Sequence, residues 1–223
     1  MKVIGINGSP RKGWNTHTLT GEALKGAASR GAETELINLY DLNFKGCISC
    51  FECKRKDGHS PGRCAVQDEL RPVLDKIDSC DAFFLASPIY INELSSAVRA
   101  FIERLTFQYI SYEKDRKPRF KRRIPVGLIY TMNIPEASLE QAGYTAKFTA
   151  YEALFTHIFG AAKTLLSTET LQTRDYARYG ITMVSEADRK KRREDVFPGD
   201  CGKAFDMGAE FARSAACGST ESL

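Results

Sequence analysis

The sequence predicts an α/β protein in which a doubly wound parallel sheet of five strands carries helices on both faces. Short apolar runs alternate along the chain with longer segments of helical periodicity, which is the pattern of βαβ units. The run AFFLA at 82–86 has no polar position, as expected of a central parallel strand that helices cover on both sides. A length of 223 residues, without an internal repeat or a low-complexity tract, suits a single domain over 1–223.

Each strand is predicted at an apolar run, and each helix at a segment of helical spacing. The predicted strands are residues 2–6, 33–39, 82–86, 125–130 and 163–171. The predicted helices are residues 16–29, 68–78, 95–107, 139–158 and 200–215. Asp68 and Asp200 each offer a carboxylate to the free N–H groups of a first turn. Residues 87–94 are expected to form a loop, and the cysteine-rich loop at about 40–67 is long enough to suggest a function.

Composition and charge exclude several functional classes. The chain has 32 basic and 28 acidic residues and a net charge of +4, too small by itself to indicate a nucleic-acid partner. Its basic runs, 114–123 and 189–193, contain a single aromatic residue, Phe120, and no recognised nucleic-acid motif, so we interpret them as a solvated helix face or linker. The apolar run near the N-terminus is too short for a signal peptide, and no segment approaches the roughly 20 apolar residues of a membrane span. We therefore expect a cytoplasmic protein with neither a membrane nor a nucleic-acid partner.

The loop after the first predicted strand has the composition of an anion-binding site, because such loops present backbone N–H groups and a helix N-terminus to a phosphate. Gly8 and Gly13 match the glycines of a Walker A loop, but Trp14-Asn15 replaces its Lys-Ser/Thr pair, which argues against an ATPase. The dinucleotide pattern G-x-G-x-x-G is absent as well. The donors that remain suit a terminal phosphate such as that of FMN, and they are Ser9, Arg11, Asn15, Thr16 and Thr18. An ordinary polar loop is the alternative interpretation.

Three loop motifs carry a resemblance to a known family. They are NGSPR at 7–11 followed by Asn15-Thr16 and Leu19, SPIY at 87–90 followed by AFIER at 100–104, and YTMN at 130–133. In order and spacing, over about residues 1–160, these motifs resemble the NAD(P)H-dependent FMN reductase and iron–sulfur flavoprotein family, which has a flavodoxin-like fold.

This resemblance implies the strand order 2-1-3-4-5 and an FMN site at the carboxyl ends of the first, third and fourth strands. The residues that would hold the phosphate and ribityl end of FMN are Ser9, Arg11, Asn15, Thr16, His17 and Thr18. Those that would hold the flavin ring are Pro88, Ile89, Tyr90, Asn92, Thr131, Met132 and Asn133. Because a flavin supplies the hydride chemistry itself, no acid–base side chain is expected to be catalytic. The expected activity is electron transfer from NAD(P)H to a small acceptor such as a quinone, by a homo-oligomer.

Four of the seven cysteines fall in the cysteine-rich loop. Cys47, Cys50 and Cys53 follow C-x2-C-x2-C spacing, and Cys64 comes after ten further residues. Thiolates at such spacing can converge on an iron–sulfur cluster, and the resembled family includes flavoproteins with a [4Fe–4S] cluster on a more compact motif. Zinc with Cys64 or His59 as the fourth ligand, and thiols without a metal, are the alternatives. The second function that these cysteines suggest is that of an electron carrier between redox proteins, with FMN and a [4Fe–4S] cluster.

Overall fold

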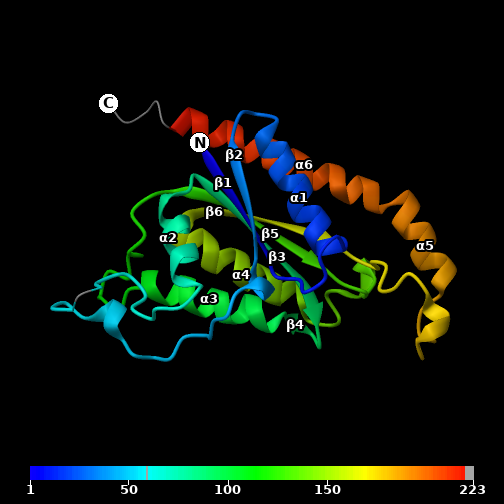
Figure 1. Ribbon diagram of the computed structural model, residues 1–223, viewed down its shortest axis with the longest axis horizontal. Helices are drawn as coiled ribbons and strands as arrows, with labels where there is room; N and C mark the ends of the chain where they lie inside the picture. The colour runs from blue at the N-terminus through cyan, green and yellow to red at the C-terminus, as the bar shows by residue number, and fades with distance from the viewer. Residues whose placement is uncertain (59, 219–223) are drawn as a thin grey trace.

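The computed structural model describes residues 1–58 and 60–218, with side chains as far as Arg213 (Figure 1). Its main sheet holds five parallel strands in the order β2-β1-β3-β5-β6. These strands are β1 (Lys2–Asn7), β2 (Glu33–Asn38), β3 (Ala82–Tyr90), β5 (Ile124–Thr131) and β6 (Gly160–Ser167). A two-residue strand, β4 (Glu93–Leu94), pairs antiparallel with the end of β3. The predicted order of the five parallel strands is confirmed, and β4 is an addition to them.

Helices cover both faces of this sheet. They are α1 (Asn15–Ala28), α2 (Arg71–Ser79), α3 (Ser96–Tyr109), α4 (Tyr144–Phe159), α5 (Glu186–Asp195) and α6 (Phe197–Gly218). Successive residues of β3 point to opposite faces: Phe83 belongs to an apolar cluster with residues of α2, α3 and α4, whereas Phe84 belongs to one with residues of α1 and α6. No helix in the described part of the chain is long and apolar enough to cross a membrane.

The segment predicted as a loop over 87–94 is a tight hairpin. β3 continues to Tyr90 and returns as β4, so that Tyr90 pairs with Glu93. The turn consists of Ile91 and Asn92, whose φ angles are 48° and 60°. Two successive positive φ angles are typical of the type I′ turns that join antiparallel strands. Isoleucine disfavours this backbone region, so the local sequence does not indicate the turn.

Two helices begin later than predicted, each for a local reason. α2 begins at Arg71, because the carboxylate of Asp68 receives the N–H of Leu70 and forms an ion pair with Arg104 instead of capping the helix. α4 begins at Tyr144, which follows a glycine with a φ of 76°, rather than near residue 139.

The C-terminal part differs most from the prediction. The basic run at 189–193 lies on a helix, α5, but its Arg189 is buried, and β6 ends at Ser167 rather than at residue 171. Ser185 accepts a hydrogen bond from the N–H of Asp188 at 3.2 Å, which is an N-terminal capping interaction. Asp200 is buried inside the first turn of α6, where it accepts hydrogen bonds from Ser167 and from Arg192 rather than capping the helix.

α6 packs closely along α1 (Figure 1). A Cβ atom on Gly208 would lie 1.8 Å from the carbonyl oxygen of Ala23, and one on Gly26 would lie 1.9 Å from that of Phe205. Only glycine allows two helix backbones to approach this closely. Because α5 leads directly into α6, this contact also holds α5 near the beginning of α1.

Candidate functional site

The loop after β1 is held by its own polar groups and by α3. The Asn7 amide donates to the carbonyl oxygen of Ser9 at 3.2 Å, and the N–H of Ser9 donates back to Asn7 Oδ1 at 3.2 Å. The N–H of Gly8 donates to the carbonyl oxygen of Ala86 in β3 at 2.8 Å. A Cβ atom on Gly8 would lie 1.9 Å from Val98 Cγ2, so this approach requires glycine. The β1 loop is therefore fixed against the end of β3.

The N-terminus of α1 faces the same edge of the sheet. Its first turn holds no acidic residue, so the positive end of the helix dipole can attract an anion. Thr16 Oγ1 lies 2.7 Å from Thr131 Oγ1 at the end of β5, and both side chains are buried. The N–H of Arg11 donates to Ser9 Oγ at 3.1 Å. These contacts bring together predicted residues that are 115 positions apart in the chain.

The β3–β4 hairpin forms the second wall of this edge. Pro88 is buried and lies opposite Thr131 in the register between β3 and β5. Ile89 belongs to the paired part of the hairpin. Asn92 Oδ1 accepts a hydrogen bond from the Tyr144 hydroxyl at 2.6 Å, so its side chain is engaged by α4 and not by the β1 loop.

Tyr90 joins the hairpin to the β1 loop, with 43% of its surface exposed. Partial burial raises the pKa of Tyr90, and the nearby Arg11 and Ser9 oppose that rise. The Arg11 guanidinium stacks on the Trp14 ring with its Cζ 3.5 Å from the centroid, and it donates to the carbonyl oxygen of Gln172 at 2.7 Å. Tyr90 thus offers a half-exposed aromatic ring beside the β1 loop.

The segment after β6 returns to this edge and supplies residues that the sequence motifs did not indicate. Arg193 donates to Asn15 Oδ1 at 2.8 Å, and the Asn15 amide nitrogen donates to the carbonyl oxygen of Leu171 at 2.9 Å. Arg189 donates to Asn133 Oδ1 at 2.9 Å. Two predicted flavin ligands therefore contact α5. The signal that could have found these arginines is their i, i+4 spacing, which places them on one helix face.

Three further residues that were predicted to bind the flavin have fewer contacts with the loops at this edge. Met132 is buried, and its backbone forms hydrogen bonds with Ser167 at the end of β6 and with Thr170 just after it. His17 and Thr18 are half-buried near the start of α1. In the described part of the chain, no hydrogen bond joins either of these two side chains to the other loops.

The residues at this edge fit FMN. The hydroxyl groups of Ser9 and Thr16 and an acid-free helix end are suited to a phosphate. The exposed ring of Tyr90 is suited to a flat heterocycle.

A second candidate site lies in the cysteine-rich loop. Its four predicted ligands, Cys47, Cys50, Cys53 and Cys64, line one cavity of about 20 Å³ against α3. Burial raises the pKa of Cys53, and the three neighbouring thiols add to the rise. The ten-residue gap therefore does not prevent Cys64 from reaching the other three.

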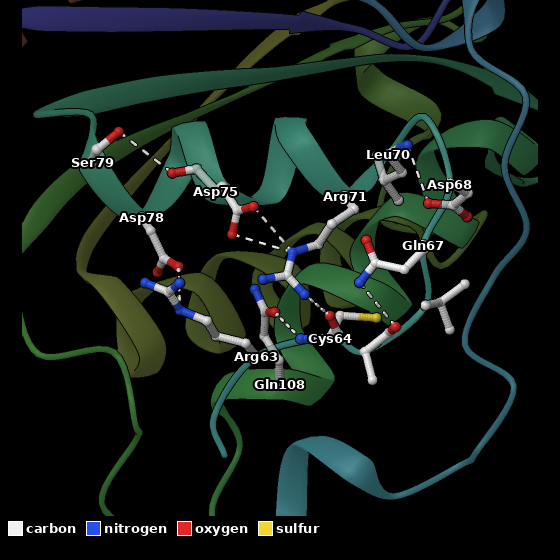
Figure 2. Close-up of polar contacts among 12 residues, drawn as sticks. Arg63, Cys64, Gln67, Asp68, Leu70, Arg71, Asp75, Asp78, Ser79 and Gln108 are labelled. Carbon is white, nitrogen blue, oxygen red and sulfur yellow. Dashed lines mark hydrogen bonds and ion pairs between the residues drawn. The ribbon is translucent and has the colours of Figure 1, made fainter. Parts of the chain in front are cut away.

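The backbone of Cys64 forms hydrogen bonds with side chains of α2 and α3, as Figure 2 shows. Its N–H donates to Gln108 Oε1 of α3 at 2.8 Å, and Arg71 of α2 donates to its carbonyl oxygen. Arg71 also pairs with Asp75 at 3.1 Å. The end of the cysteine-rich loop is therefore held in one place by side chains from both neighbouring helices.

Two buried donors face the same cavity. Arg104 Nε donates to Cys64 Sγ at 2.9 Å. Gln108 Nε2 is buried on the cavity lining without a hydrogen-bond partner among the described residues. Because a buried N–H without an acceptor is unfavourable, a sulfur anion in this cavity would satisfy it.

The donor chemistry thus fits an iron–sulfur cluster, although the side chains are not in a metal-binding arrangement. Within residues 1–58 and 60–213, no group of three or more Cys, His, Asp or Glu side chains is placed to hold a metal ion. His59, the alternative zinc ligand, lies outside the described residues.

α3 connects the two candidate sites. At its beginning, Ser95 Oγ donates to the carbonyl oxygen of Gly8 at 2.7 Å. At its end, the Lys54 ammonium donates to the carbonyl oxygens of Phe107 and, at 2.6 Å, of Ile110. Lys54 comes from the short helix Glu52–Lys54, which contains Cys53, and burial lowers the pKa of Lys54. One helix is therefore attached to the β1 loop at one end and to the cysteine-rich loop at the other.

The chain is similar to several known flavoproteins. A model of the NADPH-dependent FMN reductase family matches residues 1–144. An iron-sulfur flavoprotein of Methanocaldococcus jannaschii is 39% identical over 104 residues, which are 47% of this chain and 51% of that protein. An iron-sulfur flavoprotein of Methanosarcina thermophila is 31% identical over 104 residues, 47% of this chain and 52% of that protein. The chain spans about half the length of these curated relatives.

Among solved structures, an NAD(P)H:quinone oxidoreductase from Methanothermobacter marburgensis has a TM-score of 0.68 to this chain. The two are 15% identical, and the match covers 94% of this chain and 98% of that one. At this identity the likeness shows the fold.

Proposed function

Because this chain belongs to the NADPH-dependent FMN reductase family, we propose that it is an FMN-dependent NAD(P)H oxidoreductase that reduces a small acceptor such as a quinone. The observation that carries the proposal is the meeting of three loops at one edge of the sheet, where Thr16 contacts Thr131 and Gly8 contacts Ala86. When bound, FMN would accept a hydride from NAD(P)H and pass electrons to the acceptor.

The side chains bind and orient the cofactor in this proposal. Ser9, Thr16 and the N-terminus of α1 would hold the phosphate, because they combine hydroxyl groups with a positive helix end. Pro88 and Tyr90 would hold the ring, since proline fixes the backbone and tyrosine offers an aromatic face. No side chain is assigned the transfer of a proton.

The experiment is a titration of the flavin-free protein with FMN, followed by an anaerobic assay of NAD(P)H oxidation with a water-soluble quinone. We expect one FMN bound per chain and quinone reduction that depends on FMN. A protein that binds no FMN, or that oxidises NAD(P)H equally well without it, contradicts the proposal.

A matched pair of variants tests the site. Gly8→Ala places a Cβ atom 1.9 Å from Val98 Cγ2, so it should displace the β1 loop and weaken FMN binding. Gly21→Ala in α1 meets no atom within 4 Å and should bind FMN as the wild type does. Circular dichroism of both variants separates a lost site from a lost fold.

The cysteine cavity favours a second candidate function, an electron carrier that holds FMN and a [4Fe–4S] cluster and exchanges electrons with redox proteins. Four cysteines around one cavity and the unpartnered Gln108 Nε2 support it. Anaerobic purification with iron and sulfide analysis is the test. Stoichiometric iron that is lost in Cys64→Ala and retained in Cys201→Ala supports the carrier, because Cys201 lies in α6. Iron-free protein with full quinone reductase activity counts against it.

A further inference from the structure

α5 brings a positive charge without a carboxylate partner to the beginning of α1. The guanidinium of Arg193 donates one hydrogen bond, to Asn15 Oδ1 at 2.8 Å, and stacks on the Phe197 ring with its Cζ 3.9 Å from the centroid. Among the side chains that the structure describes, no Asp or Glu forms an ion pair with it. Burial lowers the pKa of Arg193, which reflects the cost of keeping this charge partly out of water.

The other arginines of the same helix are paired. Arg189 lies 3.0 Å from a Glu169 carboxylate oxygen, and Arg192 lies 2.7 Å from one of Asp200. Arg193 is half-buried like Arg192, yet it faces a helix end that is itself positive. Two positive groups placed together out of bulk water are unfavourable unless an anion lies between them.

Asn15 does not provide that counter-charge, because it is neutral. Its amide nitrogen is already used by the carbonyl oxygen of Leu171 and its oxygen by Arg193. The guanidinium of Arg193 carries five N–H donors, so most of them remain for a ligand. The planar arrangement of these donors matches two phosphate oxygens.

We propose that Arg193 binds the 5′-phosphate of FMN, together with the β1 loop and the N-terminus of α1. The inference rests on the proposed function. It assigns part of the phosphate site to a helix that lies beyond residues 1–144, the stretch that the family model matches. Asn15 then acts as a positioning residue, which holds the guanidinium toward the phosphate.

A comparison of two flavins tests the proposal, because riboflavin lacks the phosphate. Dissociation constants for FMN and riboflavin are measured by flavin fluorescence on flavin-free wild type, Arg193→Gln and Arg193→Lys at one ionic strength. Lys191→Gln is the matched control, since it removes the same charge from an exposed position of α5.

We expect Arg193→Gln to raise the dissociation constant of FMN about tenfold to a hundredfold and to change that of riboflavin less than about twofold. Arg193→Lys should recover part of the preference for FMN, because it keeps the charge but not the planar donors. Lys191→Gln should bind both flavins as the wild type does.

Other outcomes overturn the inference. Equal weakening of FMN and riboflavin by Arg193→Gln would mean that Arg193 only supports the loop. If Arg193→Gln binds FMN as the wild type does but prefers NADPH over NADH less strongly in steady-state assays, Arg193 binds the 2′-phosphate of NADPH instead. If the wild type binds neither flavin, the proposed function itself is overturned. If the wild type binds FMN and Arg193→Gln binds it with the same dissociation constant, this inference alone is overturned.

Discussion

Arg104 joins the cysteine-rich loop to α3 through a guanidinium group that solvent does not reach. It donates to Cys64 Sγ, to both carboxylate oxygens of Asp68 and to the carbonyl oxygens of Lys45 and Val66. Burial alone would raise the pKa of Asp68, but the hydrogen bonds and charge of Arg104 lower it below its usual range. The carboxylate therefore stays charged at neutral pH and balances the buried cation.

Asp68→Asn should lower the free energy of unfolding by about 3 kcal/mol at pH 7, because Arg104 would remain buried without a counter-charge. The folded-state pKa of Asp68 is depressed, so its contribution is present above the unfolded value of 3.8 and is lost as pH falls through the folded value. Urea denaturation should thus show the two proteins converging below pH 3.8. Asp57→Asn, which breaks an exposed pair with Arg55, should have no measurable effect. Equal losses in both variants would refute the assigned role of Arg104.

Among the secondary-structure elements, the contact between α1 and α6 sets the position of α5. Gly208→Ala adds a Cβ atom 1.8 Å from the Ala23 carbonyl oxygen, so the helices must separate. Such overpacking should cost about 1–3 kcal/mol of unfolding free energy, although alanine is the better helix former. Gly202→Ala in the same helix meets no atom within 4 Å and should be neutral or stabilising. Thermal denaturation of both variants measures the difference, and a stabilised Gly208→Ala protein would contradict the packing argument.

An element was predictable where the conformational preference of its own residues agreed with the conformation that the surrounding structure imposes. β3 was predictable because its buried apolar run is typical of a central strand. The β3–β4 turn was not, since Ile91 and Asn92 adopt positive φ angles that only the surrounding hairpin enforces. α5 was not predicted as an element, because its basic run is also typical of a linker. Its start signal lies just before that run, where Ser185 caps the helix by accepting a hydrogen bond from the N–H of Asp188.

At the scale of the whole molecule, the place of the proposed flavin site was predictable because parallel strands bring their carboxyl ends to one edge. That rule gathers the β1, β3 and β5 loops, including the Thr16–Thr131 contact. It does not indicate which later segment covers them. The Arg193–Asn15 hydrogen bond spans 178 positions and depends on the α1–α6 packing, for which the sequence offers no short-range signal.

Binding of FMN should stabilise the whole fold, because the ligand would join three loops that end separate strands. At free FMN a hundredfold above its dissociation constant, the unfolding free energy should rise by about 2.7 kcal/mol. Differential scanning fluorimetry across an FMN series would record this as a rising midpoint temperature. Adenosine monophosphate at the same concentrations is the control for unspecific binding of phosphate esters, and an equal rise with it would argue against a flavin site.

The attachment of α3 at both of its ends makes it a rigid spacer between the two sites. Ser95 holds its beginning to Gly8, and Lys54 holds its end to the cysteine-rich loop. A helix of 14 residues is about 21 Å long. Through this helix, the cysteine-rich loop and the β1 loop are each one hydrogen bond away from the same rigid element.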